Sequence, residues 1–119
     1  MRRVALLAVV VAAAVLAPSA AAKVTYCAPT GDFCTSVKKL KGIRPFRITS
    51  FAFSGRVKIC VRAPKGGPVC HSFRLTKQGP AYGLSVRWLR HYPYRGPGTY
   101  RVSFFLGSTL LGPVLSFVP

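Results

Sequence analysis

Apolar and polar residues alternate in short runs through most of the chain after residue 22, and glycines and prolines separate the runs. In the clearest run, residues 56–62, Val57, Ile59 and Val61 would face one side of a strand and the intervening residues the other. A repeat of two residues is typical of strands with one buried face, whereas amphipathic helices repeat every three to four residues. The pattern therefore predicts an all-β protein.

A second alternating run, residues 69–75, follows a turn-rich loop at residues 63–68 and predicts a hairpin with the first run. Placing Cys60 opposite Cys70 sets the register of this hairpin. The same register puts Val61 opposite Val69 and Val57 opposite Phe73 on the buried face, and Arg56 opposite Arg74 on the outer face. The cysteines and the apolar pattern thus predict the same pairing.

Further strands are predicted at residues 84–88, at 100–106, and at 114–117 after a turn at Gly107-Ser108. Residues 46–53 change phase, which suggests a bulge near Thr49-Ser50, and residues 35–40 form a weaker strand. About six or seven short strands in one domain favour a two-sheet antiparallel sandwich of the immunoglobulin-like or fibronectin-like type.

A resemblance supports this fold. In residues 95–102, Arg-Gly-Pro-Gly-Thr-Tyr-Arg-Val, a glycine turn leads into a strand whose first buried residue is Tyr100. This segment resembles the entry to the penultimate strand of immunoglobulin-like modules, and the chain resembles small secreted immunoglobulin-like proteins of high-GC bacteria. The resemblance implies a fold and no activity. The Cys…Trp…Cys spacing of antibody domains is missing, because Trp88 follows all four cysteines.

The first 22 residues have the pattern of a secretory signal peptide. Met1-Arg2-Arg3 is positively charged, residues 4–16 are apolar, and residues 17–22 are small, with Ala20 and Ala22 suited to signal peptidase. The apolar run is shorter than the roughly 20 residues that span a bilayer. We therefore expect cleavage near Ala22-Lys23, secretion of one domain at residues 23–119, and no transmembrane segment. General secretory and twin-arginine export both remain open.

The four cysteines, Cys27, Cys34, Cys60 and Cys70, allow three disulfide pairings. Secretion into an oxidising compartment favours disulfides, and we prefer the two local pairs, Cys27–Cys34 and Cys60–Cys70. Zinc binding is the alternative, but the chain lacks the C-x2-C unit common in zinc sites. We expect no metal and no cofactor.

Charge is the strongest indication of a partner. Residues 23–119 contain all the lysines and arginines of the chain except Arg2 and Arg3, and their only acidic side chain is Asp32. Their net charge is therefore +15, two less than the +17 of the whole chain. Such a surface attracts anionic polymers and anionic membranes. The candidate anion-binding residues are Lys38, Lys39, Lys41, Arg44, Arg47, Arg56, Lys58, Arg62 and Arg74. A solvated face that only maintains solubility is the alternative interpretation.

Few residues are available for catalysis. Asp32 is the only carboxylate side chain, which excludes a pair of carboxylates of the glycosidase kind, and it lies in a predicted turn. A Ser-His-Asp triad would need Asp32 with His71 or His91, and two histidines could also cleave RNA by acid–base chemistry. Alternation places His71 on the buried side opposite Ile59, so structural roles are preferred. We expect no enzyme.

The sequence thus predicts a monomeric, non-catalytic, cationic binding module for wall polymer, acidic lipid or acidic polysaccharide, without specific nucleic-acid recognition. One alternative is an antimicrobial or hydrolase-inhibitor protein that acts through the disulfide-tied loop of the 60–70 hairpin, because a pre-rigidified loop binds at lower entropic cost. Another is a structural module of the envelope. Leu89 and Phe105 fall on the outward phase of their strands and mark a possible apolar partner site.

Overall fold

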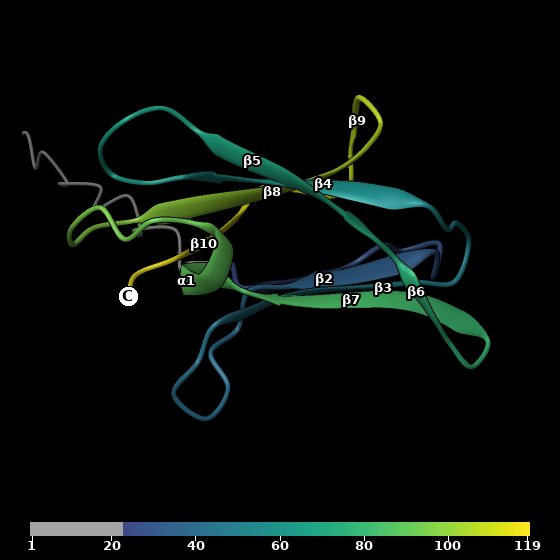
Figure 1. Cartoon of the computed structure of the whole chain (residues 1–119). Coiled ribbons are helices and arrows are strands. Elements are labelled where there is room, and N and C mark those ends of the chain that lie inside the picture. The colour runs from purple at the N-terminus through teal and green to yellow at the C-terminus, as the bar shows by residue number, and fades with distance from the viewer. Residues whose placement is uncertain (1–22) are drawn as a thin grey trace, which may run out of the picture.

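The computed structural model describes residues 23–119, and the predicted signal peptide lies outside the described residues. The chain forms two antiparallel sheets of five strands each. The two sheets face one another as two layers (Figure 1). The first sheet contains β1 (Thr25–Cys27), β2 (Phe33–Ser36), β3 (Pro45–Ser50), β7 (Ala81–Arg87) and β6 (Thr76–Gln78), in that order. The second contains β10 (Leu115–Phe117), β8 (Tyr100–Leu106), β4 (Arg56–Arg62) and β5 (Val69–Arg74), with β9 (Thr109–Leu110) paired to β8. One short helix, α1 (Trp88–His91), connects β7 to the loop before β8.

The strand order is that of an immunoglobulin-like sandwich. If β2, β3, β7 and β6 are lettered A, B, E and D, the first sheet has the order A-B-E-D. The second sheet then has the order G-F-C-C′, with β10 as G, β8 as F, β4 as C and β5 as C′. These are the neighbours expected in that fold, with β1 and β9 as short additions. The predicted fold class is confirmed.

The β4–β5 hairpin has the predicted register. Cys60 pairs with Cys70, Val57 with Phe73, and Arg56 with Arg74. The predicted disulfides are both present, Cys27–Cys34 between β1 and β2, and Cys60–Cys70 between β4 and β5. In each hairpin the bridge joins directly opposed residues, so the covalent link and the strand pairing reinforce one another.

The core forms where the inner faces of the two sheets meet. Both sheets contribute side chains with at most 1% exposure: Phe46, Ile48, Val57, Ile59, Tyr100, Val102, Phe104, Leu115 and Phe117. Trp88 closes one end of this core, with its ring centroid 4.9 Å from that of Phe117 and 5.0 Å from that of Tyr100. Alternating residues on facing strands thus fill the interior in the way expected of a sandwich.

Tyr100 ties the loop before β8 to the start of that strand. Its hydroxyl donates to the carbonyl of Gly96 at 2.7 Å and accepts from the backbone N–H of Arg95 at 2.8 Å. A tyrosine near the start of the F strand that bonds back to the preceding loop is a hallmark of immunoglobulin-like domains. Gly96 and Gly98 have positive φ angles, and Tyr100 is the first buried residue of β8.

Several element boundaries differ from the predictions. Strand β2 ends at Ser36, so residues 37–40 are not strand, and Trp88 begins α1 instead of ending a strand. No bulge occurs near residues 49–50, because β3 pairs regularly with both neighbours up to Ser50. The buried Ser50 hydroxyl accepts the N–H of Phe53 at 2.9 Å and donates to its carbonyl at 2.7 Å, which turns the chain.

The described residues also contain more strands than predicted. The additional strands are short: β1, β6 and β9 contain two or three residues each. Strand β6, Thr-Lys-Gln, is exposed along its whole length, so it carries no apolar alternation from which it could be predicted.

Candidate functional site

The candidate anion-binding residues lie on three separate surfaces. Arg56, Lys58, Arg62 and Arg74 are exposed on the outer face of the second sheet. Arg47 is exposed on the outer face of the first sheet, which is the opposite side of the sandwich. The remaining four, Lys38, Lys39, Lys41 and Arg44, belong to the connection between β2 and β3. A single flat ligand cannot contact all of these surfaces, so the structure divides the predicted set.

The outer face of the second sheet carries cations in directly opposed pairs. Arg56 lies opposite Arg74, and Arg62 lies opposite Arg101 of β8. Lys58 lies between these pairs along β4, with its ammonium nitrogen 5.0 Å from the centroid of the Phe105 ring. Successive outward residues of a strand are about 6.7 Å apart, and the outward residues of β4 are Arg56, Lys58, Cys60 and Arg62, so the strand presents three cations with the disulfide cysteine between Lys58 and Arg62.

Arg101 was not among the predicted residues. Its neighbours Tyr100 and Val102 are fully buried, and alternation therefore turns Arg101 outward. The signal was present in the strand predicted at 100–106. What alternation did not show is that β8 lies next to β4 and so places Arg101 opposite Arg62.

A shallow depression of about 300 Å³ lies on this face beside the Cys60–Cys70 disulfide. Its charged lining residues are Arg62 and Arg101, and its apolar lining includes Pro68, Phe105 and Val114. The only carboxylate side chain of the chain, Asp32, belongs to the turn between β1 and β2 in the other sheet. No acidic side chain therefore neutralises the cations of this face.

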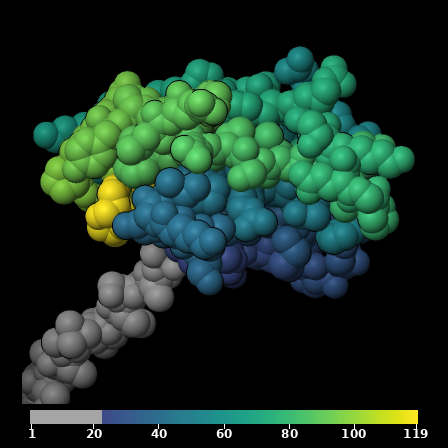
Figure 2. Space-filling model, turned by 60° about the horizontal axis from the view of Figure 1, so that its bottom comes forward, coloured from purple at the N-terminus to yellow at the C-terminus, as the bar shows by residue number. Residues whose placement is uncertain are grey.

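A larger pocket of about 400 Å³ lies at the end of the sandwich that carries α1. Three segments line it: the β2–β3 connection, α1 with the residue before it, and the C-terminal residue Pro119. Figure 2 shows the segment around residue 40 in blue, the segment around residue 90 in green and the C-terminus in yellow, all meeting on one face. The pocket has four cationic lining residues: Lys39, Arg44, Arg87 and Arg90.

Arg44 has a structural role as well as a place in this pocket. Its guanidinium donates to the carbonyl of Val37 at 2.9 Å and lies 4.1 Å from the centroid of the Phe117 ring. Partial burial lowers the pKa of Arg44 from its ordinary value. The charge is thus held in one position, where it fastens the β2–β3 connection to β10.

The two histidines come together, contrary to the separate structural roles predicted for them. The rings of His71 and His91 have centroids 6.2 Å apart, and the ring of Tyr92 lies 5.1 Å from that of His71. His71 is exposed, so the prediction that it faces the core was wrong. It does lie opposite the buried Ile59, but it belongs to β5, which is an edge strand and is only partly covered by the other sheet.

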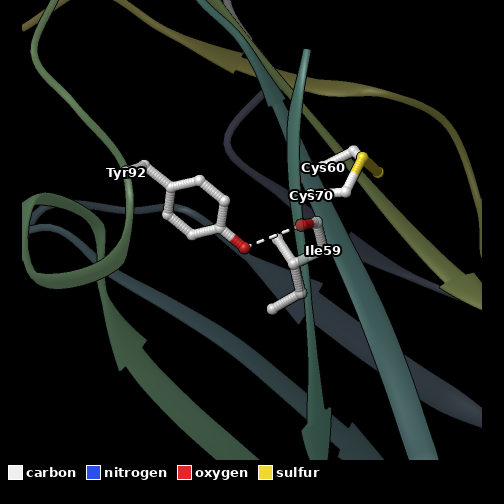
Figure 3. The surroundings of a disulfide bond; sticks show 4 residues. All are labelled: Ile59, Cys60, Cys70 and Tyr92. Carbon is white, nitrogen blue, oxygen red and sulfur yellow. Dashed lines mark hydrogen bonds between the residues drawn. A yellow bond between two sulfur atoms is a disulfide. The ribbon is translucent and has the colours of Figure 1, made fainter.

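Tyr92 anchors the loop between α1 and β8 to the second sheet, as Figure 3 shows. Its buried hydroxyl donates to the carbonyl of Ile59 at 2.7 Å, beside the Cys60–Cys70 bridge. Burial raises the pKa of the Tyr92 hydroxyl, and the backbone N–H of His71 acts less strongly in the opposite direction.

Asp32 lies in the turn between β1 and β2 of the first sheet, whereas His71 belongs to the second sheet and His91 to α1, so these residues do not form a Ser-His-Asp triad. Within residues 23–119, no three His, Cys, Asp or Glu side chains are grouped as a metal ion would require.

The 63–68 loop, considered above as an inhibitory element, packs against residues 95–98. A Cβ atom at Gly66 would overlap the Arg95 guanidinium, and one at Gly98 would lie 2.8 Å from the Pro64 ring. The segment that precedes β8 therefore packs against the loop at Pro64 and Gly66.

Comparisons with protein-family models, with curated proteins and with solved structures find no match for this chain. Nor does any helix within the part of the chain that the structure describes have the length and apolar character to cross a membrane.

Proposed function

We propose that this protein is a secreted, non-catalytic, cationic module that binds anionic extracellular polymers on the outer face of its second sheet. The ligand class is defined by repeated negative charge, as in a phosphate-bearing wall polymer or an acidic polysaccharide. Contacts would be made by Arg56, Lys58, Arg62, Arg74 and Arg101.

The observation that carries the proposal is the pairing of like charges on this face. Arg56 with Arg74, and Arg62 with Arg101, are directly opposed residues of neighbouring strands. Like charges in directly opposed positions destabilise a sheet, because their Cβ atoms are only about 5 Å apart. A bound polyanion removes this repulsion and replaces it with attraction, so the unfavourable arrangement becomes a binding surface.

A sheet face on which five cations are spread over three strands also fits a polymer better than a small molecule. The depression beside the disulfide is shallow and open on the sheet surface, and its polar lining is mainly Arg62 and Arg101. A long chain of negative charges can contact several of these side chains at once and release their counterions. Affinity would then depend on the number of contacts more than on the exact chemistry of the polymer.

The decisive measurement is the salt dependence of binding to long-chain polyphosphate and to isolated wall polymer. If five cations engage, the slope of log K against log salt should be roughly −3.5 to −4.5. Retention that persists unchanged in molar salt, or no retention at low salt, would contradict the proposal.

A charge-matched pair of variants locates the surface. R62Q/R101Q should reduce the size of the slope by roughly 1.5 to 2, because two contacts are lost. R47Q/K77Q removes the same total charge from exposed positions of the first sheet and should change the slope by less than roughly 0.5. Equal losses in the two variants would show that net charge alone drives binding.

Secretion is part of the proposal. Its support is the predicted leader at residues 1–22 together with two disulfides, which persist in oxidising compartments. The mature protein should begin at or within two residues of Lys23. Intact-mass analysis of protein from the culture medium would contradict this if Met1 to Ala22 were still attached.

A further inference from the structure

The end of the sandwich that carries α1 combines exposed aliphatic side chains with cations. The proposed binding of polymer to the second sheet does not involve these aliphatic side chains. The β2–β3 connection and α1 both contribute to it, and they line the 400 Å³ pocket together. In Figure 1 the β2–β3 connection extends away from the two sheets. This surface is distinct from the outer face of the second sheet.

The tip of the β2–β3 connection is a tight two-residue turn. Leu40 and Ile43 exchange backbone hydrogen bonds of 2.8 and 3.0 Å, and the two residues between them have positive φ angles, 48° at Lys41 and 81° at Gly42. Positive φ at both central residues defines the tight hairpin turn that favours glycine. The turn holds Leu40 and Ile43 opposite one another, directly beside the Lys41-Gly42 tip, with 37% and 39% of their surface exposed.

Helix α1 presents a second aliphatic group beside this tip. Leu89 is 62% exposed, although the preceding residue, Trp88, is only 6% exposed. The backbone N–H of Trp88 donates to the carbonyl of Arg44 at 3.1 Å, which fastens the start of α1 to the β2–β3 connection. Ile43 and Leu89 therefore line the same pocket from two different segments.

Cations surround these aliphatic side chains. Arg87 and Arg90 flank Trp88 and Leu89, and Lys39 lines the pocket from the β2–β3 connection. Exposed aliphatic groups gain nothing from a hydrated polymer, but they gain free energy when they enter the apolar part of a bilayer. Lysine and arginine beside them would contact the phosphates of anionic lipid headgroups.

We infer that this end of the molecule docks onto the surface of an anionic lipid bilayer. Leu40, Ile43 and Leu89 enter the interface between headgroups and acyl chains, and Lys39, Arg87 and Arg90 bind headgroup phosphates. The pocket between them receives one headgroup. This docking does not depend on the proposed polymer-binding face, and the two can be separated by mutation.

The test is binding of the purified protein to vesicles of phosphatidylcholine with or without 40% phosphatidylglycerol. Trp88 is the only tryptophan of the chain and lines the pocket, so its fluorescence reports on this end. Vesicles containing phosphatidylglycerol should bind the protein, and brominated acyl chains should quench Trp88. Pure phosphatidylcholine should bind at least roughly 100-fold more weakly, because the attraction of several cations is lost.

Two double variants distinguish the contribution of the aliphatic side chains of this surface to vesicle binding from that of exposed apolar residues elsewhere on the protein. I43S/L89S should weaken vesicle binding by roughly tenfold or more. The control is F51S/L110S, because Phe51 and Leu110 are 60% and 43% exposed, which closely matches the 62% of Leu89 and the 39% of Ile43. This control should change vesicle binding by less than about twofold if residues outside the docking surface do not enter the bilayer.

Charge variants separate this surface from the polymer-binding face. K39Q/R90Q should weaken vesicle binding by roughly 30-fold, at about fivefold per cation, and leave the salt slope for polyphosphate nearly unchanged. R62Q/R101Q should show the reverse. Equal effects of the two charge variants on vesicle binding would overturn the docking surface.

The aliphatic variant provides a second way to refute the inference. If K39Q/R90Q weakens vesicle binding but I43S/L89S does not differ from F51S/L110S, the aliphatic side chains do not enter the bilayer. The occupant of this end would then be a soluble polyanion, and the inference would be wrong.

Discussion

Replacing Tyr100 by Phe removes a single hydroxyl group from the start of β8 and leaves the buried ring in place. The ring is fully buried and packs against Trp88 and Phe117, with centroid distances of 5.0 and 5.4 Å. These contacts do not involve the hydroxyl. The variant therefore isolates the two hydrogen bonds that the hydroxyl makes to the backbone of Arg95 and Gly96.

The expected loss of stability follows from these two bonds. Each contributes about 1 kcal/mol net, and the N–H of Arg95 and the carbonyl of Gly96 lose a partner in a partly buried position. We expect Y100F to lower the free energy of unfolding by about 2 kcal/mol. For a domain of this size, that is a large fraction of the total.

Urea denaturation followed by Trp88 fluorescence measures this loss. With a slope m of roughly 1.2 kcal/mol per molar urea, the midpoint should fall by about 1.7 M. The control is Y94F, because Tyr94 is 54% exposed and stacks on Tyr100 at 6.3 Å between ring centroids. Its loss should stay below about 0.5 kcal/mol. Equal midpoints for the two variants would refute the anchoring role of the Tyr100 hydroxyl.

Two further predictions concern the second sheet. C60S/C70S should lower the free energy of unfolding by roughly 2–4 kcal/mol, because the bridge closes a short loop in the unfolded chain. A non-reducing peptide map that linked Cys60 to any cysteine other than Cys70 would contradict the pairing. The second prediction concerns alkaline pH. Burial raises the pKa of Tyr92 in the folded protein above the ordinary value of 10.0. The stability that the neutral hydroxyl contributes is therefore fully present below pH 10 and decreases as the pH rises above 10. Y92F should lose about 1 kcal/mol at neutral pH with the bond to Ile59, and denaturation curves should show a smaller decline above pH 10 than in the parent protein.

The sequence allowed the β4–β5 hairpin to be predicted because two independent signals agreed there. Alternation assigned Val57 and Val61 to one face, and the Cys60–Cys70 pair set the register, which β4 and β5 adopt. Where only one signal was available, the boundaries moved. The phase change after Ile48 suggested a bulge, but a turn held by the buried hydroxyl of Ser50 produces the same change of phase.

The candidate sites were less predictable, because alternation assigns a side chain to one face of its own strand and contains no information about the neighbouring strand. The outward direction of Arg62 and Arg74 was predictable. Arg101 lies opposite Arg62 because β8 pairs with β4, and these two strands are far apart in the sequence. His71 shows the same limitation, since its phase is that of a buried residue but its strand lies at the edge of the sheet.

The secondary-structure class, the preference for the two local disulfide pairs and the excess of positive charge could be predicted from the sequence, because they depend on composition and on separations of about ten residues or fewer. The distribution of that charge over the surface depends on the tertiary structure. Packing the two sheets face to face turns Arg47 to one side of the sandwich and Arg62 to the other. The same packing brings Ile43 and Leu89 from distant segments to one pocket, because both segments leave the sheets at the same end of the sandwich.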